Sequence, residues 1–442
     1  MVLSVLIALP AAAGPARAQD SPAPRSERPY RGLFRSGADD AAHVLTATAS
    51  VGGGYDEVLL RGVDSTGDPL RRLSGGYSMV SGGLSYGLTV RRFAFVANGT
   101  TAGRLYANSS DRWLQSRNAN ALLGVQLFPA TRVTVGESYY YSPYNLLALS
   151  MGAFGSTGFG TLSPALIDDD VAFSRLRYSA FATTGTIVQS FRQKARTTMQ
   201  LDYAYARREI TSTGLSASGS FYEDHRAGGT IQRQWTRNLS LRLAYHYRRT
   251  DYPSASERQR FEGHDLNAGV DFNRPLSLTR RTQVSFSTGS VAYATQTRTQ
   301  YRLSGDARLT HEIGRTWSAS LVFGRNIGFV DTFDRPILYE AVTAGVSGLI
   351  TRRVQFNANV RSVDGDVGLT GVDNGYHMYM GTASLTTSVS RSIGMSATYY
   401  YLQYRFQTGA ALPTNIDREG ERQGIRGTIS VWVPLINRAR KP

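Results

Sequence analysis

The chain has 442 residues and a formal net charge of +16, contributed almost wholly by arginine, because Lys194 and Lys441 are its only lysines. It contains no cysteine, which excludes disulfides and thiolate metal sites. No long stretch repeats apolar residues at three- and four-residue spacing, so the sequence predicts an all-β protein. Beyond the N-terminal residues no apolar run has the length of a membrane-spanning helix, which excludes an α-helical membrane protein.

The first residues have the pattern of a signal peptide. Residues 2–13 form a short apolar run, and residues 16–18 read Ala-Arg-Ala, an A-x-A cleavage site. The run is too short to span a bilayer as an anchor helix. We therefore expect residues 1–18 to be removed during export, although the basic residues that usually precede such a run are missing. Residues 19–43 are polar and contain proline, and we expect a periplasmic N-terminal segment there.

From residue 44 onward, long segments of alternating polar and apolar residues are separated by connections of two kinds. Short corners that carry an arginine lie at FPATRVTV (128–135), WTRNLSL (235–241), IGRTWSASL (313–321), ITRRVQF (350–356) and VSRSIGM (389–395). Longer, more polar connections lie at 56–73, 106–116, 142–172, 251–260, 364–374 and 408–420. Alternating short and long connections are typical of a transmembrane β-barrel, with turns in the periplasm and loops outside the cell.

The segment count gives about 18 strands, and a count of 16 fits as well. An even number places both chain ends on the short-turn side. The sequence thus predicts a transmembrane antiparallel up-and-down β-barrel over residues 44–436, followed by a tail at 437–442. Outer-membrane barrels usually end on an aromatic residue, whereas this chain continues past Trp432. We therefore expect either an internal ISVWV assembly signal or a tail that simply trails.

One segment shows what the two faces of the sheet carry. In LSLRLAYHYRRT (239–250), leucines and tyrosines occupy one parity, whereas serine, arginine and histidine occupy the other. Successive side chains of a strand point to opposite faces, and similar alternation recurs near residues 197, 301, 353 and 425. An arginine on the lipid face at mid-depth would cost about 2–4 kcal/mol. We therefore expect the apolar face to meet lipid and the arginines to line a water-filled lumen.

A soluble β-sandwich with outward-facing arginines is the alternative to a barrel. Two features favour the barrel. Several segments approach the roughly nine to eleven residues needed to cross a membrane at a tilt. Tyrosines cluster near segment ends, as in ESYYYSPY (137–144) and TYYYLQY (398–404), which is typical of interfacial girdles. The alternation slips near Tyr399–Tyr401 and Gly229–Trp235, where we expect bulges or flared strand ends.

A barrel of this size encloses an aqueous channel. The arginines predicted to line it are Arg175, Arg177, Arg242, Arg248, Arg302, Arg308, Arg361 and Arg426. A wall rich in arginine favours anions, and guanidinium groups bind carboxylates and phosphates through paired hydrogen bonds, which suits a polyanionic sugar. The alternative is that these arginines pair with Asp202, Asp271, Asp306 and their neighbours and merely pack the lumen.

The sequence carries no recognisable catalytic or cofactor motif. Its six histidines lack H-x-x-x-H spacing, and it has no G-x-S-x-G elbow and no glycine loop for phosphate. IDDD at 167–170 has the composition of a calcium loop but reads more simply as an exposed acidic loop. We therefore expect no enzyme activity, no cofactor and no metal, and we expect His246 to be a lumen or rim residue. A hydrolase with an Asp/His or Ser/His pair at the rim stays open.

Residues 44–436 as a whole resemble bacterial outer-membrane porins. More narrowly, ASVGGGYDEVLL (49–60) is similar to an element of the β-barrel porin family associated with exopolysaccharide loci, which has a Tyr-Asp-Asp-Asn-like sequence here. Tyr55 and Asp56 match that element, whereas Glu57 and Val58 depart from it. The arginine-lined design also resembles the porin that exports alginate. These resemblances imply passive passage of an anionic polysaccharide or of smaller anions.

The sequence therefore predicts a channel in the bacterial outer membrane that passes anionic solutes and, in the finer form of the prediction, exports an acidic exopolysaccharide. Its expected partners are outer-membrane lipid, the barrel-assembly machinery and the anionic solute, and nucleic acid is not among them. A monomer is favoured over an oligomer. A plugged structural or adhesive barrel that acts through its extracellular loops, above all 142–172, is the alternative.

Overall fold

The computed structural model describes thirteen stretches of the chain. These are residues 41–60, 75–106, 113–142, 176–191, 196–212, 220–236, 239–253, 258–272, 281–294, 299–329, 336–367, 374–407 and 418–439. The predicted signal peptide, most of the predicted N-terminal segment and the IDDD stretch lie outside them. The described stretches contain no helix that is long and apolar enough to cross a bilayer.

The described residues form eighteen strands. The first nine are β1 (Ala41–Leu60), β2 (Gly75–Val90), β3 (Phe93–Tyr106), β4 (Trp113–Phe128), β5 (Thr131–Ser142), β6 (Leu176–Phe191), β7 (Thr197–Ser212), β8 (Ser220–Gln234) and β9 (Leu239–Pro253). The others are β10 (Arg258–Phe272), β11 (Thr282–Ala294), β12 (Thr299–Ile313), β13 (Trp317–Phe329), β14 (Pro336–Leu349), β15 (Val354–Val367), β16 (Gly375–Ser388), β17 (Ile393–Phe406) and β18 (Glu419–Ala439).

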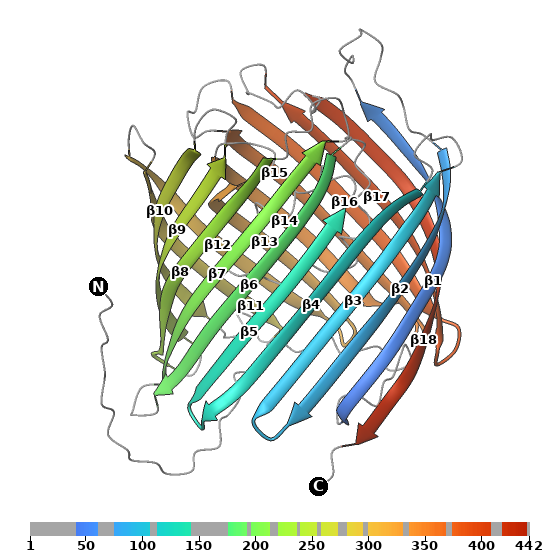
Figure 1. Cartoon of the computed structure of the whole chain (residues 1–442), viewed down its shortest axis with the longest axis horizontal. Helices are drawn as coiled ribbons and strands as arrows, with labels where there is room; N and C mark the ends of the chain where they lie inside the picture. The colour runs from blue at the N-terminus through green and yellow to red at the C-terminus, as the bar shows by residue number, and fades with distance from the viewer. Residues whose placement is uncertain are drawn as a thin grey trace.

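These strands close into one ring. Each strand pairs antiparallel with the next in sequence, and β18 pairs antiparallel with β1. Ala41 at the start of β1 lies opposite Ala439 at the end of β18. The first strand therefore begins, and the last strand ends, at the same end of the barrel (Figure 1). The predicted all-β, antiparallel up-and-down barrel is confirmed, and of the two strand counts the larger one, 18, is correct.

Short and long connections alternate around most of the ring as predicted. At one end, which we call the short-turn end, β2 and β3 are separated by two residues and β12 and β13 by three. At the other, the long-loop end, β5 and β6 are separated by residues 143–175. The exception is at β10–β11, where nine residues separate the strands at the short-turn end, against four at β9–β10 and four at β11–β12. The ring extends slightly beyond the predicted 44–436, because β1 begins at Ala41 and β18 includes the first residues of the predicted 437–442 tail.

Of the two outcomes expected near residues 399–401 and 229–235, bulges or flared strand ends, the bulges are wrong. β17 keeps an unbroken register with both neighbours through Tyr399, Tyr400 and Tyr401, and β8 does the same from Gly229 to Arg233. The pattern misleads because tyrosine occurs on both faces here: Tyr399 is 46% exposed whereas Tyr400 is 7% exposed. Register shifts occur instead in β1, between Leu45 and Thr46, and in β4, between Gln126 and Phe128.

Large exposed apolar side chains share one parity of almost every strand and form a belt around the ring. Among the described residues Val96 of β3 and Leu122 of β4 are exceptions, since they lie on the opposite parity. In β9 the exposed set contains Leu243 and Tyr245, whereas Ala244 and His246 of the other parity are buried. The run from Leu239 to Tyr247 climbs about 20 Å at the usual rise and tilt, close to the roughly 25 Å apolar band of membrane barrels. Glu137 of β5 interrupts the belt and accepts a hydrogen bond of 3.0 Å from Thr183.

Aromatic rings border the belt at both ends. Toward the long-loop end, the hydroxyls of Tyr203 and Tyr245 lie 3.0 and 2.8 Å from the Nδ1 atoms of His225 and His264 on the next strands. Charged side chains follow on the same face, as in the ion pair of 2.9 Å between Arg260 and Asp251. At the short-turn end the rings of Tyr86 and Phe95 (6.0 Å between centroids) and of Trp317 and Phe356 (6.1 Å) lie together.

The opposite parity faces the inside of the ring, because its side chains meet across intervening strands. Tyr106 of β3 bonds Asp56 of β1 past β2, and His246 of β9 contacts Asp202 of β7 past β8. Arg242 of β9 reaches Asp306 of β12 past two strands. Side chains from non-neighbouring strands converge only on the concave face of a curved sheet, so this is the lumen wall.

The two faces can be compared on adjacent residues of β15. Val360 is 60% exposed on the outer face, and Asn359 is exposed on the inner face. Replacing Val360 with arginine is expected to lower the free energy of unfolding by about 2–4 kcal/mol, because the charge enters lipid. Asn359→Arg is the matched control and should cost at most about 1 kcal/mol, the worth of one hydrogen bond. Urea unfolding in lipid vesicles measures both, and equal losses would contradict the assignment of the faces.

Candidate functional site

The inner wall of the barrel is the candidate functional site. Of the eight predicted lumen arginines, the structure places six on the inward parity: Arg242, Arg248, Arg302, Arg308, Arg361 and Arg426. Arg177 belongs to β6, but its side chain is outside the described part, and Arg175 lies outside it altogether. The six are spread over β9, β12, β15 and β18 and do not form one cluster.

Arg242 lies flat along the wall. Its guanidinium covers Gly269 of β10, where an added Cβ would stand 3.0 Å from Nε, and its Nη2 is 3.9 Å from Oδ1 of Asp306 on β12. Ser287 of β11 also hydrogen-bonds Asp306. Glycine at 269 is what allows the long side chain to cross the strand without rising into the lumen.

A charged network fills the wall between β7 and β10. His246 is 6% exposed; its ring covers Gly228, and its Nε2 lies 3.4 Å from Oδ1 of Asp202. Arg226 stands close enough to Asp202 and Asp265 to interact electrostatically with both carboxylates. The pairing alternative for the lumen arginines named Asp202, which contacts His246 and interacts electrostatically with Arg226 instead.

Arg248 belongs to the same network. Its Nε donates a hydrogen bond of 2.6 Å to Oδ1 of Asp224, which also accepts one of 2.7 Å from Thr250. Asp224 is 6% exposed and Thr250 is fully buried. Arg248 also interacts electrostatically with Tyr339 on β14. Arg248 is therefore a paired residue that also borders the lumen.

A second polar group joins the first and last strands. Oδ2 of Asp56 on β1 accepts a hydrogen bond of 3.0 Å from Arg422 on β18 and one of 2.6 Å from the hydroxyl of Tyr106 on β3. Asp56 is 0% exposed and Arg422 6%. We call these three residues the Asp56 clasp. The guanidinium of Arg422 also lies 5.2 Å above the ring of Tyr400, a favourable cation–π distance.

The wall at β14–β17 is apolar toward the long-loop end. Its buried members are Ile337, Tyr339, Ala341, Val363, Val367, Tyr376, Met378, Leu402, Tyr404 and Phe406. They lie on the inward parity, and Ile337 and Val363 are 0 and 1% exposed. The sequence reading, which expected polar residues on this face throughout, missed this cluster.

Toward the short-turn end the wall also carries small neutral polar groups. Ser85, Asn98 and Asn120 form a hydrogen-bonded chain over β2, β3 and β4, with 3.0 Å between the two amides. Similar pairs are Ser318–Ser347 at 3.0 Å and Ser396–Thr428 at 2.5 Å. Hydroxyls and amides of this kind accept and donate hydrogen bonds without imposing a charge.

Arginine exceeds carboxylate on the described inward face. Besides the six predicted arginines, this face carries Arg104, Arg132, Arg208, Arg226 and Arg422. Its carboxylates with described side chains are Asp56, Asp202, Asp224, Asp265, Asp306 and Glu312. The side chain of Asp271, named in the pairing alternative, lies outside the described part. Pairing thus compensates a part of the positive charge and leaves a surplus.

Within the described stretches no group of three or more histidine, aspartate and glutamate side chains is placed to hold a metal ion. His377 and Asp364 hydrogen-bond each other on the outer face at the long-loop end. This pair is the kind of rim histidine and acid that the hydrolase alternative needs, but it stands outside the lumen wall.

Solved structures with a similar chain path are outer-membrane proteins. Pseudomonas aeruginosa OpdQ is 11% identical, with 89% of this chain and 98% of that chain covered and a TM-score of 0.45. The Pseudomonas aeruginosa siderophore receptor PirA is 10% identical, with 88 and 80% covered and a TM-score of 0.42. The copper transporter OprC is 11% identical, with 89 and 81% covered and a TM-score of 0.42. No protein-family model and no curated protein matches the sequence. Similarity this low adds nothing to the barrel that the strand pairing already shows.

The Asp56 clasp predicts a large coupling energy. Asp56→Asn and Arg422→Gln should each lower the free energy of unfolding by about 3–5 kcal/mol, because each leaves the partner's charge buried and unpaired. The double variant should lose clearly less than the sum. Arg405 and Glu419, 2.7 Å apart with side chains 63 and 25% exposed, form the control pair on the neighbouring strands. Their coupling should be at most about 1 kcal/mol. Additive losses at Asp56 and Arg422 in a double-mutant cycle would contradict a coupled pair.

Proposed function

We propose that the protein is a channel in the bacterial outer membrane whose inner wall favours anions. The observation that carries this proposal is the division of the closed sheet into an outer face with an apolar belt between two aromatic borders and an inner face with an excess of arginine. A closed barrel leaves no unpaired strand edge, which a lipid environment requires. In this placement the short-turn end faces the periplasm and the long-loop end faces the outside.

Anion preference follows from the excess of arginines over carboxylates on the described inward face. Arg308 is exposed to the lumen on β12, and Arg302 stands on the same face of that strand. A surplus of fixed positive charge in a narrow water-filled space raises the local concentration of anions and lowers that of cations. Arg242 and Arg248 contribute less than expected from the sequence, because each has a carboxylate partner.

An acidic polysaccharide is the finer proposal for the solute. Hydroxyl and amide groups near the short-turn end offer exchangeable hydrogen bonds to sugar hydroxyls, and arginines further along offer paired bonds to carboxylates. A solute that meets many weak sites in series can enter and leave each of them. The likeness of Tyr55 and Asp56 to the element of exopolysaccharide-associated porins is consistent with this proposal.

A plugged barrel that acts through its loops is the second candidate. The observation in its favour is the burial of inward-facing Ile337, Val363 and Tyr376, since side chains on an open lumen wall would be wet. The channel should conduct ions in a bilayer and the plugged barrel should not, so a conductance measurement distinguishes the two candidates.

The test is the reversal potential of the refolded protein in a planar bilayer under a salt gradient. We expect a measurable conductance with anion preference, and Arg302→Gln/Arg308→Gln should reduce that preference because it removes lumen charge. Arg91→Gln/Arg92→Gln, which removes the same charge from the β2–β3 turn, is the control and should leave it nearly unchanged. Conductance without preference would reject the arginine argument. No conductance in any variant would favour the plugged barrel.

A further inference from the structure

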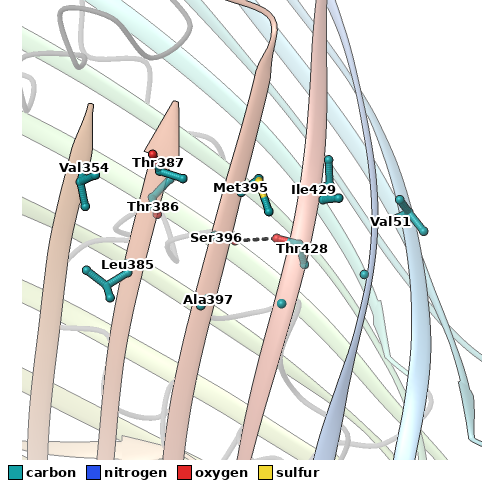
Figure 2. Close-up of a pocket in the computed structure, with 12 residues that line it drawn as sticks. Val51, Val354, Leu385, Thr386, Thr387, Met395, Ser396, Ala397, Thr428 and Ile429 are labelled. Atoms are coloured by element: carbon teal, nitrogen blue, oxygen red, sulfur yellow. Dashed lines mark hydrogen bonds between the residues drawn. The ribbon is translucent and has the colours of Figure 1, made fainter. Parts of the chain in front are cut away.

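A shallow apolar groove crosses the outer face of β15–β18 and β1. It has a volume of about 800 Å³, and its lining includes Leu385, Met395, Ile429 and Val51, all 44 to 59% exposed on the outward parity (Figure 2). Its floor is low because Ala397 and Gly427, which lie opposite each other in the β17–β18 register, are small. Larger side chains stand in the rows on either side of this floor.

The groove reaches the short-turn end. Val354, the first residue of β15, lies opposite Thr387 of β16, and both line it. Arg353 immediately precedes Val354, and its carbonyl accepts a hydrogen bond of 3.0 Å from the amide of Ser388, three residues before Arg391. The corners that join β14 to β15 and β16 to β17 therefore stand side by side at the end of the groove.

These two corners carry positive charge without compensation. Arg352, Arg353 and Arg391 are exposed, and none has an ion pair with a described residue. The carboxylates in the described parts of β14–β18 all lie toward the long-loop end: Glu340, Asp364, Asp366, Glu419 and Glu421. The corners also expose Ile350 (55%) and Val389 (53%), as expected of turns at a lipid–water boundary.

We propose that this groove and its corner arginines bind an anionic phospholipid of the leaflet at the short-turn end. One acyl chain lies in the groove, and the phosphate is held by Arg352, Arg353 and Arg391. Arginine binds phosphate through paired charge-assisted hydrogen bonds. The proposal rests on the placement of the barrel in a membrane but not on what passes through its lumen.

The positive charge of the two corners favours an anionic lipid over a second copy of the chain as the occupant of the groove. A two-fold interface through this face would bring the same patch of each copy together. The arginines of the two copies would then face one another near the short-turn end without carboxylates between them, which is unfavourable. An anionic lipid supplies both the apolar chain and the negative charge that the face lacks.

The experiment is native mass spectrometry of the full-length protein in detergent, titrated with phosphatidylglycerol or with phosphatidylcholine of the same acyl chains. Wild type should retain phosphatidylglycerol in preference to phosphatidylcholine. Arg352→Gln/Arg353→Gln/Arg391→Gln should weaken phosphatidylglycerol binding by about tenfold or more. Arg91→Gln/Arg92→Gln, at a short turn away from the groove, is the control and should bind as wild type does.

A second variant tests the groove itself. An added Cβ at Gly427 meets no heavy atom within 4 Å, so Gly427→Leu should fold and fill the floor. It should weaken binding of both lipids while keeping the preference for phosphatidylglycerol. Equal binding of the two lipids by wild type, or unchanged binding in the triple variant, would overturn the proposal. A dimer that Gly427→Leu abolishes would assign the face to a second copy instead. None of these measurements depends on conductance. A negative result for lipid binding therefore does not contradict the proposed channel.

Discussion

The structure depends on one constraint, the pairing of every strand with two neighbours. Within a bilayer no water is available to satisfy a free backbone N–H or C=O group, and each unsatisfied group costs several kcal/mol. The contact of β18 with β1 removes the two edges that seventeen consecutive hairpin pairings would leave. Once the ring is closed, each residue faces either lipid or lumen, and the chemistry of the protein follows from that division.

The division explains where the charges are. Where the residue beside it on the next strand is glycine, a long polar side chain that points inward lies along the wall rather than across the lumen. Arg242 over Gly269 and His246 over Gly228 are examples. Because they lie flat, both side chains reach a carboxylate on a non-neighbouring strand. Arg242 of β9 reaches Asp306 of β12, and His246 of β9 reaches Asp202 of β7. The wall is thus charged and held in place by its own side chains, while an excess of arginine stays in contact with water.

Strand number and topology could be predicted from the sequence, because alternation and turn spacing are local properties of the chain. The ISVWVPLINRA end of β18 could not, since its proline and asparagine are poor strand residues that β1 pairs all the same. The six arginines with a described position were placed on the correct face by parity. Of their partners, the pairing alternative named Asp306, which lies beside Arg242, but it did not name Asp224, the partner of Arg248. In YEDHRAG (222–228) charges occupy both parities, so nothing local shows that Asp224 and Arg226 face inward while Glu223 and His225 face outward.

The Asp56 clasp could not be predicted from the sequence either, because its residues come from strands that are far apart in the sequence. Asp56 and Arg422 are 366 residues apart, whereas almost all other strand contacts join neighbours in sequence. Loop-closure entropy makes such a contact the slowest to form, so hairpins precede it during folding. A chain that has formed its hairpins but has not closed carries the Asp56 carboxylate at one edge and the Arg422 guanidinium at the other, without the ion pair that joins them. Their attraction favours the correct edges meeting, and it is satisfied only when the last strand is complete. The contact that closes the ring therefore forms last, because it joins the two strands that are furthest apart in the sequence.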